Sequence, residues 1–215
     1  MKRIKNRGYF ITFEGGEGAG KTTLINCVYD YLTSKGHAVI KTREPGGTVL
    51  GRHIRDLLLY KEEDQPTKKA ELFLFLADRA QHVEKMILPA LEQGKIVLCD
   101  RFNDSTLAYQ GAARSFDPET LHHFCKFATS DLVPDLTLFL DLDPKIGLKR
   151  AEQGKGNTRD RLEKESLSFH MKVREAFLSF SQKEPHRFHV IDASQPTDKV
   201  FDIATHEISA ALCPN

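Results

Sequence analysis

The stretch that decides the fold is Phe10-Ile11-Thr12-Phe13-Glu14-Gly15-Gly16-Glu17-Gly18-Ala19-Gly20-Lys21-Thr22-Thr23, in which an apolar run leads into a glycine-rich segment. Residues 15–22 match the phosphate-binding loop pattern of a glycine, four residues and Gly-Lys-Ser/Thr. Glycines allow successive backbone N–H groups to turn inward around phosphate oxygens, and the helix that follows adds the positive end of its dipole. The sequence therefore predicts a site for a nucleoside triphosphate.

Two side chains of this phosphate loop (residues 15–22) carry the expected chemistry. Lys21 supplies a cation to the β and γ phosphates, and the hydroxyl of Thr22 can ligate Mg²⁺. Mg²⁺ is therefore the expected cofactor, with ATP as co-substrate. The residues predicted to bind ATP are Gly15, Gly16, Glu17, Gly18, Ala19, Gly20, Lys21, Thr22 and Thr23.

The pair Asp100-Arg101 narrows the class of protein. A GTPase would need an Asn/Thr-Lys-x-Asp motif, which the sequence lacks, and a motor or switch ATPase usually carries Asp-Glu or Asp-x-x-Gly after an apolar strand. Here an apolar run ends in Asp100, and Arg101 follows at once. Asp100 suits coordination of Mg²⁺ and its waters, whereas Arg101 suits bidentate capture of a second phosphate. Two adjacent phosphate sites predict transfer of a phosphoryl group to a small acceptor.

Apolar runs of strand length alternate with longer amphipathic stretches. Strands are predicted at residues 9–14, 38–42, 96–100, 136–141 and 188–192, and helices at 21–34, 49–60, 70–92, 118–129, 144–152, 162–182 and 197–212. This alternation predicts an α/β fold of the P-loop NTPase type, with a parallel five-stranded sheet and helices on both faces. Ligands of such a sheet bind at the carboxyl ends of its strands.

Composition limits the partners. The 215 residues suit a single domain spanning 1–215, and 40% hydrophobic and 28% charged residues are typical of a globular protein. With 31 Lys and Arg against 30 Asp and Glu, the net charge is +1, which does not support nucleic acid or an anionic membrane as a main partner. No stretch approaches the roughly 18 apolar residues of a membrane span. A cytoplasmic location is expected.

The four cysteines are Cys27, Cys99, Cys125 and Cys213. None belongs to a CxxC pair, and none has a His or Cys at the spacing of a zinc site. Buried, reduced thiols are therefore expected.

Residues 147–165 form a basic segment that glycines interrupt. Its cations are Lys149, Arg150, Lys155, Arg159, Arg161 and Lys164. Such a cluster is usually a solvated loop, but it is also typical of a mobile lid that brings cations to an anionic substrate. Beside a phosphate loop the second interpretation gains weight, and we predict a short basic lid at about residues 150–161.

Several further motifs extend over the chain in a fixed order. They are Glu14-Gly15, Thr42-Arg43-Glu44-Pro45-Gly46-Gly47-Thr48, Asp100-Arg101-Phe102, Tyr109-Gln110-Gly111, Pro134-Asp135-Leu136-Thr137, Leu140-Asp141 and Asp160-Arg161-Leu162-Glu163. Together with the phosphate loop, this series resembles the bacterial thymidylate kinase family over about residues 8–212. The resemblance implies phosphorylation of dTMP to dTDP by ATP. It also implies a homodimer, with the helices at 49–60 and 70–92 as candidates for the interface.

The resemblance also implies roles for the residues of an acceptor site. Arg101 would clamp the monophosphate with help from Arg43, Phe75 would stack on thymine, and Arg79 would contact the base or the monophosphate. Tyr109 would pack under the deoxyribose and exclude a 2′-hydroxyl, while Ser105 and Thr106 would reach the base edge. Glu17 would contact the sugar of the acceptor and help to position the metal ion, whose predicted ligands are Thr22 and Asp100. The predicted dTMP site is Glu17, Arg43, Phe75, Arg79, Arg101, Ser105, Thr106 and Tyr109.

From the residues alone, two of these assignments have other interpretations. Phe75 lies among Leu72, Phe73, Leu74 and Leu76, so it could be an ordinary core residue. Arg79 lies beside Asp78 in an apolar helix, and a buried arginine needs a partner.

One position departs from the pattern of some family members, which carry an arginine in the phosphate loop where this chain has Gly18. The second cation for the transferred phosphoryl group would then come from the lid, with Arg159 favoured over Lys155. The predicted catalytic residues are Lys21, Arg101, Arg159, Lys155 and Glu17.

Two other functions fit parts of the sequence. A deoxynucleoside kinase shares the sheet and lid, but it needs a carboxylate base for an uncharged hydroxyl and fewer cations than Arg43, Arg79 and Arg101 supply. A regulatory nucleotide-binding module would bind ATP without transfer.

Overall fold

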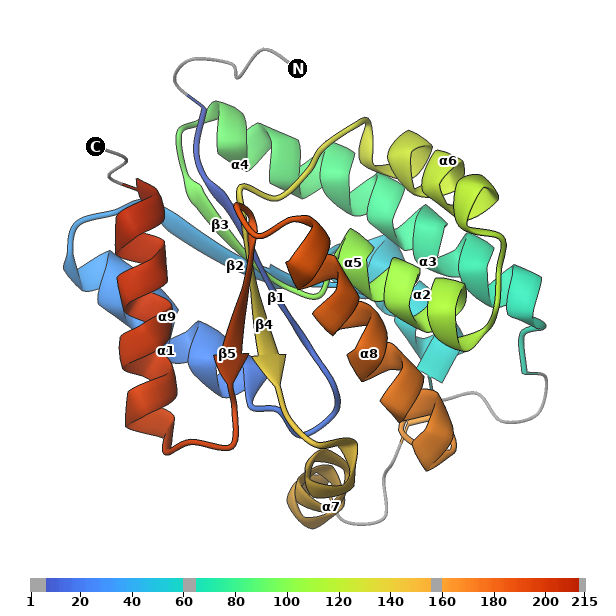
Figure 1. The fold of residues 1–215 in the computed structure, drawn as a ribbon. Coiled ribbons are helices and arrows are strands. Elements are labelled where there is room, and N and C mark those ends of the chain that lie inside the picture. The colour runs from blue at the N-terminus through green and yellow to red at the C-terminus, as the bar shows by residue number, and fades with distance from the viewer. Residues whose placement is uncertain (1–6, 60–64, 156–159, 213–215) are drawn as a thin grey trace.

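The computed structural model describes residues 7–59, 65–155 and 160–212. Five parallel strands form one sheet in the order β2-β3-β1-β4-β5 (Figure 1). Their bounds are β1 Phe10–Gly15, β2 Val39–Arg43, β3 Ile96–Asp100, β4 Leu136–Asp141 and β5 Phe188–Asp192. The α/β fold class and the five parallel strands are therefore confirmed, with strand ends within one residue of those predicted.

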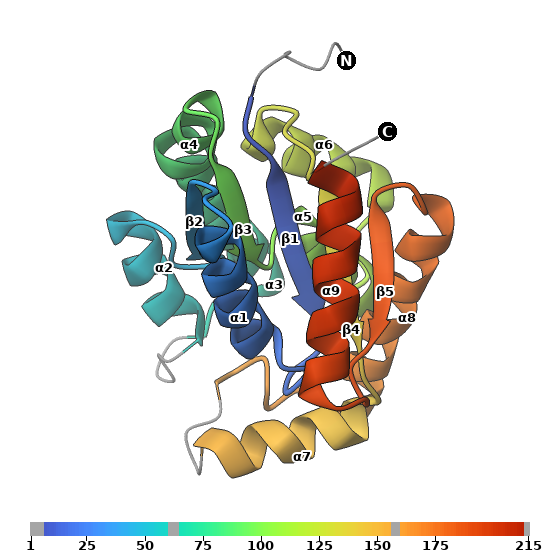
Figure 2. The ribbon, with the colours of Figure 1, turned by 90° about the vertical axis from the view of Figure 1, so that its left-hand side faces the viewer.

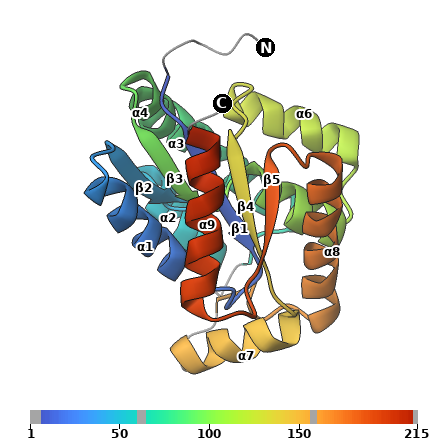
Figure 3. The same cartoon turned by 60° about the vertical axis from the view of Figure 1, so that its left-hand side comes forward.

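Helices cover both faces of the sheet. Their bounds are α1 Lys21–Ser34, α2 Val49–Leu59, α3 Lys68–His82, α4 Leu88–Glu92, α5 Asn103–Thr106, α6 Pro118–Thr129, α7 Pro144–Lys155, α8 Leu167–Lys183 and α9 Thr197–Leu212, with π-helical turns η1 Val83–Ile87 and η2 Leu107–Ala113. One face packs against α1 and α9, and α3, α6 and α8 lie on the other side (Figure 2). α7 lies across the carboxyl ends of β4 and β5 (Figure 3).

The alternation of side chains along β1 explains the two layers. Ile11 and Phe13 pack with Leu24 and Val28 of α1 on one face, whereas Phe10 packs with Ile87 on the other. Side chains of a strand alternate between faces, so a continuously apolar strand can bury both. β1 thus lies at the centre of the sheet, and the phosphate loop begins at its carboxyl end.

Three predicted helices differ from the structure. The stretch 70–92 is divided by η1, because the turn widens ahead of Pro89, which has no N–H to donate. The helix expected from residue 162 begins at Leu167, with Ser166 as N-cap, while Asp160 closes a separate turn. α7 continues to Lys155 rather than residue 152. Residues 103–113, which were assigned no helix, form α5 and η2.

The cysteines follow the expectation only in part. Cys99 and Cys125 are buried and free, but Cys27 is exposed, because it lies on the solvent side of α1. Cys213 lies outside the described residues. Within the described ranges, no helix combines the length and apolar character of a membrane span.

Candidate active site

The phosphate loop curls around the side chain of Lys21. Gly15, Gly18 and Gly20 have φ values of 147°, 66° and 89°, which glycine adopts without the strain that a side chain would bring. Lys21 is buried, and its Nζ donates to the carbonyl oxygens of Gly15 and Gly16 at 3.0 and 2.8 Å. Burial, followed by the charge of Arg101, lowers the pKa of Lys21. The loop thus holds its cation at the end of β1.

Gly18 lies directly against α7. A Cβ at this position would come within 2.1 Å of the carbonyl oxygen of Gly147, and a Cβ at Gly147 would come within 2.2 Å of the carbonyl of Glu17. The two backbones can approach this closely only because both residues are glycine. The contact explains why the loop carries no arginine at position 18, since a side chain there would displace α7.

Thr22 and Asp100 meet at the mouth of the loop. Oγ1 of Thr22 donates to Oδ2 of Asp100 at 3.0 Å. A hydroxyl and a carboxylate so close together form the kind of oxygen donor set that Mg²⁺ prefers, with waters or phosphate oxygens in its remaining positions. The residues present therefore fit the predicted metal.

Arg101 joins the loop to the segment after β3. Its NH2 donates to Oε1 of Glu17 at 2.6 Å and its NH1 to the carbonyl of Gly15 at 3.0 Å. The guanidinium lies over the ring of Tyr109, with 5.1 Å between its carbon and the ring centroid, and the Tyr109 hydroxyl donates to Glu17 at 3.3 Å. Arg101 has a φ of 68°, which is unusual for a residue with a side chain. Its position is therefore imposed by its surroundings.

Glu14 helps to hold the segment around Arg101 in place, although the sequence alone predicted no role for it. Its buried carboxyl group accepts from the backbone N–H of Phe102 at 2.8 Å and from the hydroxyl of Ser105 at 2.6 Å. Burial, followed by the charge of Asp104, raises its pKa to about 7. Glu14, near the end of β1, thus fixes the chain that follows Arg101. The signal for such a role in the sequence is the presence of a charged residue in an otherwise apolar strand.

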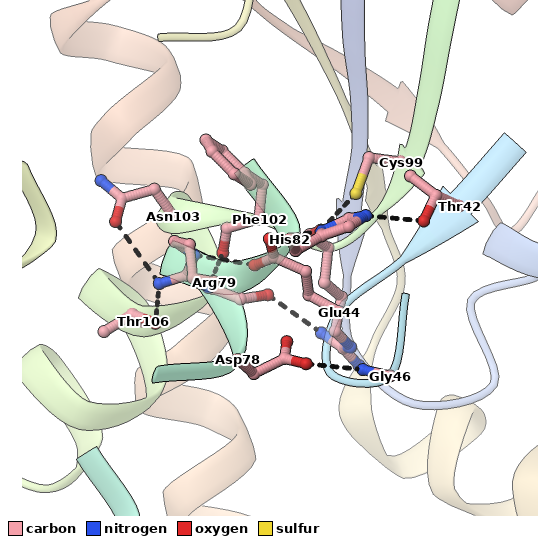
Figure 4. Close-up of polar contacts among 12 residues, drawn as sticks. Thr42, Glu44, Gly46, Asp78, Arg79, His82, Cys99, Phe102, Asn103 and Thr106 are labelled. Carbon is pink, nitrogen blue, oxygen red and sulfur yellow. Dashed lines mark hydrogen bonds and ion pairs between the residues drawn. The ribbon is translucent and has the colours of Figure 1, made fainter. Parts of the chain in front are cut away.

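Arg79 lies in a buried polar network between α3 and the end of β2 (Figure 4). Its Nε donates to Oε2 of Glu44 at 2.7 Å, its NH1 to Oγ1 of Thr106 at 2.7 Å, and its NH2 to the carbonyl of Phe102 at 2.9 Å. Burial opposes ionisation of Glu44, but Arg79 and the hydrogen bond with His82 outweigh it and lower the pKa. The partner that a buried arginine requires is therefore Glu44, and Arg79 in turn orients Thr106.

His82 and Asp78 complete this network. Nδ1 of His82 lies 2.8 Å from Oε1 of Glu44, and its Nε2 lies 2.7 Å from Oγ1 of Thr42. Oδ1 of Asp78 accepts from the backbone N–H of Gly46 at 3.0 Å, while its Oδ2 has no hydrogen-bond partner among the described residues. Burial and the charge of Glu44 raise the pKa of Asp78 to about 6. Helix α3 thus holds the chain immediately after β2.

A cavity of about 170 Å³ brings the two halves of the predicted site together. All eight residues predicted for the acceptor line it, along with Lys21, Thr22 and Asp100. Phe75 is half-buried and faces the cavity as well as the apolar cluster of α2, so it is not a simple core residue. Sequence reasoning missed other lining residues: Glu44, Pro45, Arg55, Leu59, Gln110, Asp160 and Leu162.

The two cations predicted for the lid cannot be located relative to the cavity. Arg159 lies outside the described residues, as does the side chain of Lys155, which ends α7. Arg161 is described, and it donates to Glu71 and to the carbonyl of Leu58. It is bound to the helices beside the cavity.

The fold and the cavity together define a P-loop phosphotransferase, because a phosphate loop and a second cationic pocket share one space at the carboxyl ends of parallel strands. A model of the thymidylate kinase family matches residues 13–203. The chain therefore belongs to the thymidylate kinase family.

Individual relatives agree with this assignment. The chain is 52% identical over 210 residues to the thymidylate kinase of Protochlamydia amoebophila, covering 95% of this chain and 93% of the relative. It is 53% identical over 196 residues to that of Desulfovibrio desulfuricans, with coverages of 89% and 90%. The crystal structure of thymidylate kinase from Ehrlichia chaffeensis matches with a TM-score of 0.75 at 34% identity, covering 94% of this chain and 99% of that one. These similarities do not favour the deoxynucleoside kinase alternative.

Proposed function

We propose that this protein transfers the γ-phosphoryl group of ATP to dTMP, giving dTDP and ADP. The observation that carries the proposal is that one cavity is lined both by Lys21 and Thr22 of the phosphate loop and by Arg43, Phe75 and Arg101 of the predicted acceptor site. Phosphoryl transfer requires donor and acceptor phosphates to lie in line within one water-excluding space.

The phosphate loop would hold the donor. Its backbone N–H groups and Lys21 would surround the β and γ phosphates, and Lys21 would stabilise the charge that develops during transfer. Thr22 and Asp100 would hold Mg²⁺, with Glu17 helping to position it. When bound, the metal ion neutralises charge on the β and γ oxygens.

The acceptor would lie across the cavity. Arg101 and Arg43 would hold the monophosphate, Phe75 would stack on the base, and Tyr109 would pack beneath the sugar. Ser105 donates its hydroxyl hydrogen to Glu14 and accepts from NH1 of Arg101 at 3.4 Å, which leaves one lone pair of its oxygen for a donor on the base edge. Thr106, oriented by Arg79, would contact the same edge.

The basic segment 150–161 would act as a lid that covers ATP and brings a cation to the transferred phosphoryl group. Arg159 is the first candidate and Lys155 the second. The close contact of Gly18 with Gly147 supports this proposal, because position 18 of the loop has no room for a cationic side chain.

We also propose that the protein forms a homodimer and acts in the cytoplasm. Three neighbouring helices expose large apolar side chains: Val49 and Leu50 on α2, Phe73 on α3, and Phe124 and Phe127 on α6. Phe127 is 88% exposed, and Phe73 and Phe124 form an edge-on pair with 5.7 Å between centroids. Large exposed apolar side chains on neighbouring helices favour association. Light scattering coupled to size-exclusion chromatography would report the mass, and a monomer at micromolar concentration would contradict it.

The reaction itself is tested with a panel of acceptors and Mg·ATP, followed by ADP release. We expect turnover of dTMP, poorer turnover of dUMP, and very poor turnover of AMP and GMP. Thymidine in place of dTMP separates the two kinase classes, because a deoxynucleoside kinase would phosphorylate it. ATP binding without ADP release from any acceptor would indicate a regulatory module.

A further inference from the structure

Glu71, in the first turn of α3, is a buried carboxylate on which three other side chains converge. Only 1% of its surface is exposed. Its Oε1 accepts from Nε2 of Gln110 at 3.0 Å and from Nε of Arg114 at 3.3 Å. Its Oε2 accepts from NH2 of Arg114 at 3.2 Å and from NH2 of Arg161. The carboxylate thus joins segments that lie 39 to 90 positions away along the chain.

The charge of Glu71 is favoured by these partners. Burial opposes ionisation, but hydrogen bonds from Gln110 and Arg161, together with the charges of Arg161 and Arg114, outweigh it and lower the pKa. One carboxylate balances two guanidinium groups, of which Arg114 also pairs with Glu165 at 2.6 Å. Removing the charge of Glu71 therefore leaves Arg161 without its acidic partner among the described residues.

Arg161 fastens the chain that leads into α8 to the end of α2. Its Nε donates to the carbonyl of Leu58 at 3.0 Å, and its backbone N–H donates to that of Leu59 at 3.2 Å. The last carbonyls of a helix favour a cation. The neighbours of Arg161, Asp160 and Leu162, both line the cavity. Holding Arg161 outside the cavity thus sets the position of a wall that includes Asp160 and Leu162.

Gln110 links Glu71 to a second stretch of the cavity wall. It is buried, it lines the cavity, and it follows Tyr109 in the wide turn of η2. Its amide donates to Glu71, so Glu71 fixes the orientation of a side chain that faces the predicted acceptor. Two stretches of the cavity wall, from distant parts of the chain, are therefore tied to one buried charge.

We propose that Glu71 is a positioning residue that holds two stretches of the acceptor pocket's wall where dTMP requires them, acting through Arg161 on one stretch and Gln110 on the other. The proposal rests on the proposed function, because it takes the cavity as the dTMP site. Glu71 does not line the cavity, so its effect on the substrate is indirect. Within the described parts of the chain, the hydrogen bonds and ion pairs of Glu71 go to Gln110, Arg114 and Arg161 and not to the phosphate loop, so ATP binding by the free enzyme should not depend on Glu71.

The test is Glu71→Gln, which keeps the shape of the side chain and removes its charge. Calorimetric titration with dTMP alone should show weaker binding, and steady-state kinetics should show a rise in the KM for dTMP of roughly ten-fold or more, as expected for misplaced substrate contacts. Binding of a non-hydrolysable ATP analogue to the free enzyme should change less than about two-fold, because Lys21 and the loop are untouched. A merely structural residue would change both affinities or neither.

Asp135→Asn is the matched control. Asp135 also binds an arginine and a buried segment, accepting from Arg7 at 2.8 Å and from the backbone N–H of Phe10 at 2.9 Å. It lies ahead of β4, at the amino end of the sheet and away from the cavity. Both variants should lower the Tm, but only Glu71→Gln should weaken the binding of dTMP. Equal loss of dTMP affinity in the two variants would overturn the proposal.

A second variant keeps the proposal testable if Glu71→Gln does not fold. Arg161→Met retains much of the side-chain volume, and it should raise the KM for dTMP in the same direction. Where both variants fold, the loss of dTMP binding free energy in the double variant should be smaller than the sum of the losses in the two single variants, because the residues act through one contact. Strict additivity would contradict the proposal. If the wild-type protein neither binds nor phosphorylates dTMP, the proposed function fails; if it does and Glu71→Gln equals it, only the role of Glu71 fails.

Discussion

Oε1 of Glu17 lies 2.6 Å from NH2 of Arg101, so an ion pair joins the phosphate loop to the segment that follows β3. The two residues are 84 positions apart, and both line the same cavity. A monophosphate bound to Arg101 would therefore lie next to the acidic residue of the phosphate loop. This arrangement places the proposed acceptor directly beside the proposed donor.

Lys21→Ala should remove most turnover and leave the fold intact. Lys21 acts on charge that develops during transfer, and loss of one such group lowers kcat by about 10²–10³-fold. Circular dichroism would check the fold, and ADP release would measure kcat. Lys41→Ala is a control, since Lys41 is exposed and its Nζ binds only Asn26 and the ring of Tyr29 among the contacts described. An unchanged kcat in Lys21→Ala would show that the loop has been misinterpreted.

Arg101→Ala should chiefly weaken the use of dTMP. Loss of a charge-assisted contact with phosphate costs roughly 1.5–3 kcal/mol, and this loss should appear in kcat/KM for dTMP. ATP binding should stay measurable by titration. Should ATP affinity fall while dTMP affinity holds, the two phosphate sites have been assigned the wrong way round.

Tyr109→Ala should open space beneath the sugar and relax discrimination against ribonucleotides. The measurement is the ratio of kcat/KM for dTMP to that for the ribonucleotide with the same base. Tyr109→Phe keeps the ring and loses the hydroxyl, with its 3.3 Å hydrogen bond to Glu17, so it should retain the preference. If the preference survives in the alanine variant, Tyr109 is a packing residue.

The buried carboxyl of Glu14 should make stability depend on pH. Its pKa is raised from 4.5 to about 7, so between these values the folded state binds more protons than the unfolded state. The stability that Glu14 contributes is therefore complete below pH 4.5 and is lost as the pH rises through about 7. Glu14→Gln removes this group while leaving Asp78 and the other titrating residues in place.

Urea unfolding of both proteins across this pH range measures the effect. The free energy of unfolding of the wild type, relative to Glu14→Gln, should fall as the pH rises from about 5 to 7 and then level off. A difference that stays constant over the whole range would show that Glu14 titrates as an ordinary carboxyl.

The lid prediction concerns Arg159 and Lys155. Arg159→Ala should lower kcat by about 10³-fold or more, the scale of an arginine finger, while ATP affinity changes much less. Single-turnover kinetics on both variants separates the chemical step from product release. Near-normal chemistry in each variant would mean that the segment is only a cover.

Local motifs made much of the protein predictable. The phosphate loop directly follows a strand and leads directly into a helix, so its geometry follows from neighbouring residues. Five strand runs with helical stretches between them predicted the parallel sheet, because several of the strands are apolar on both faces. The carboxyl ends of adjacent parallel strands meet at one edge, so Arg43 at the end of β2 and Asp100 at the end of β3 could be expected to lie together.

Contacts between distant residues needed the tertiary structure. No sequence pattern pairs Arg79 with Glu44 or Arg161 with Glu71. A buried charged side chain needs a partner, but the sequence does not show which residue provides it. The helical turns at 103–113 also escaped prediction, because they are short and their buried polar residues bind Glu14, Arg79 and Glu71 instead of forming an apolar stripe. The sequence by itself determined the chemistry that the site can perform. The contacts of α3 with β2 and with the segments that follow β2 and β3 decided which buried charges hold that site in place.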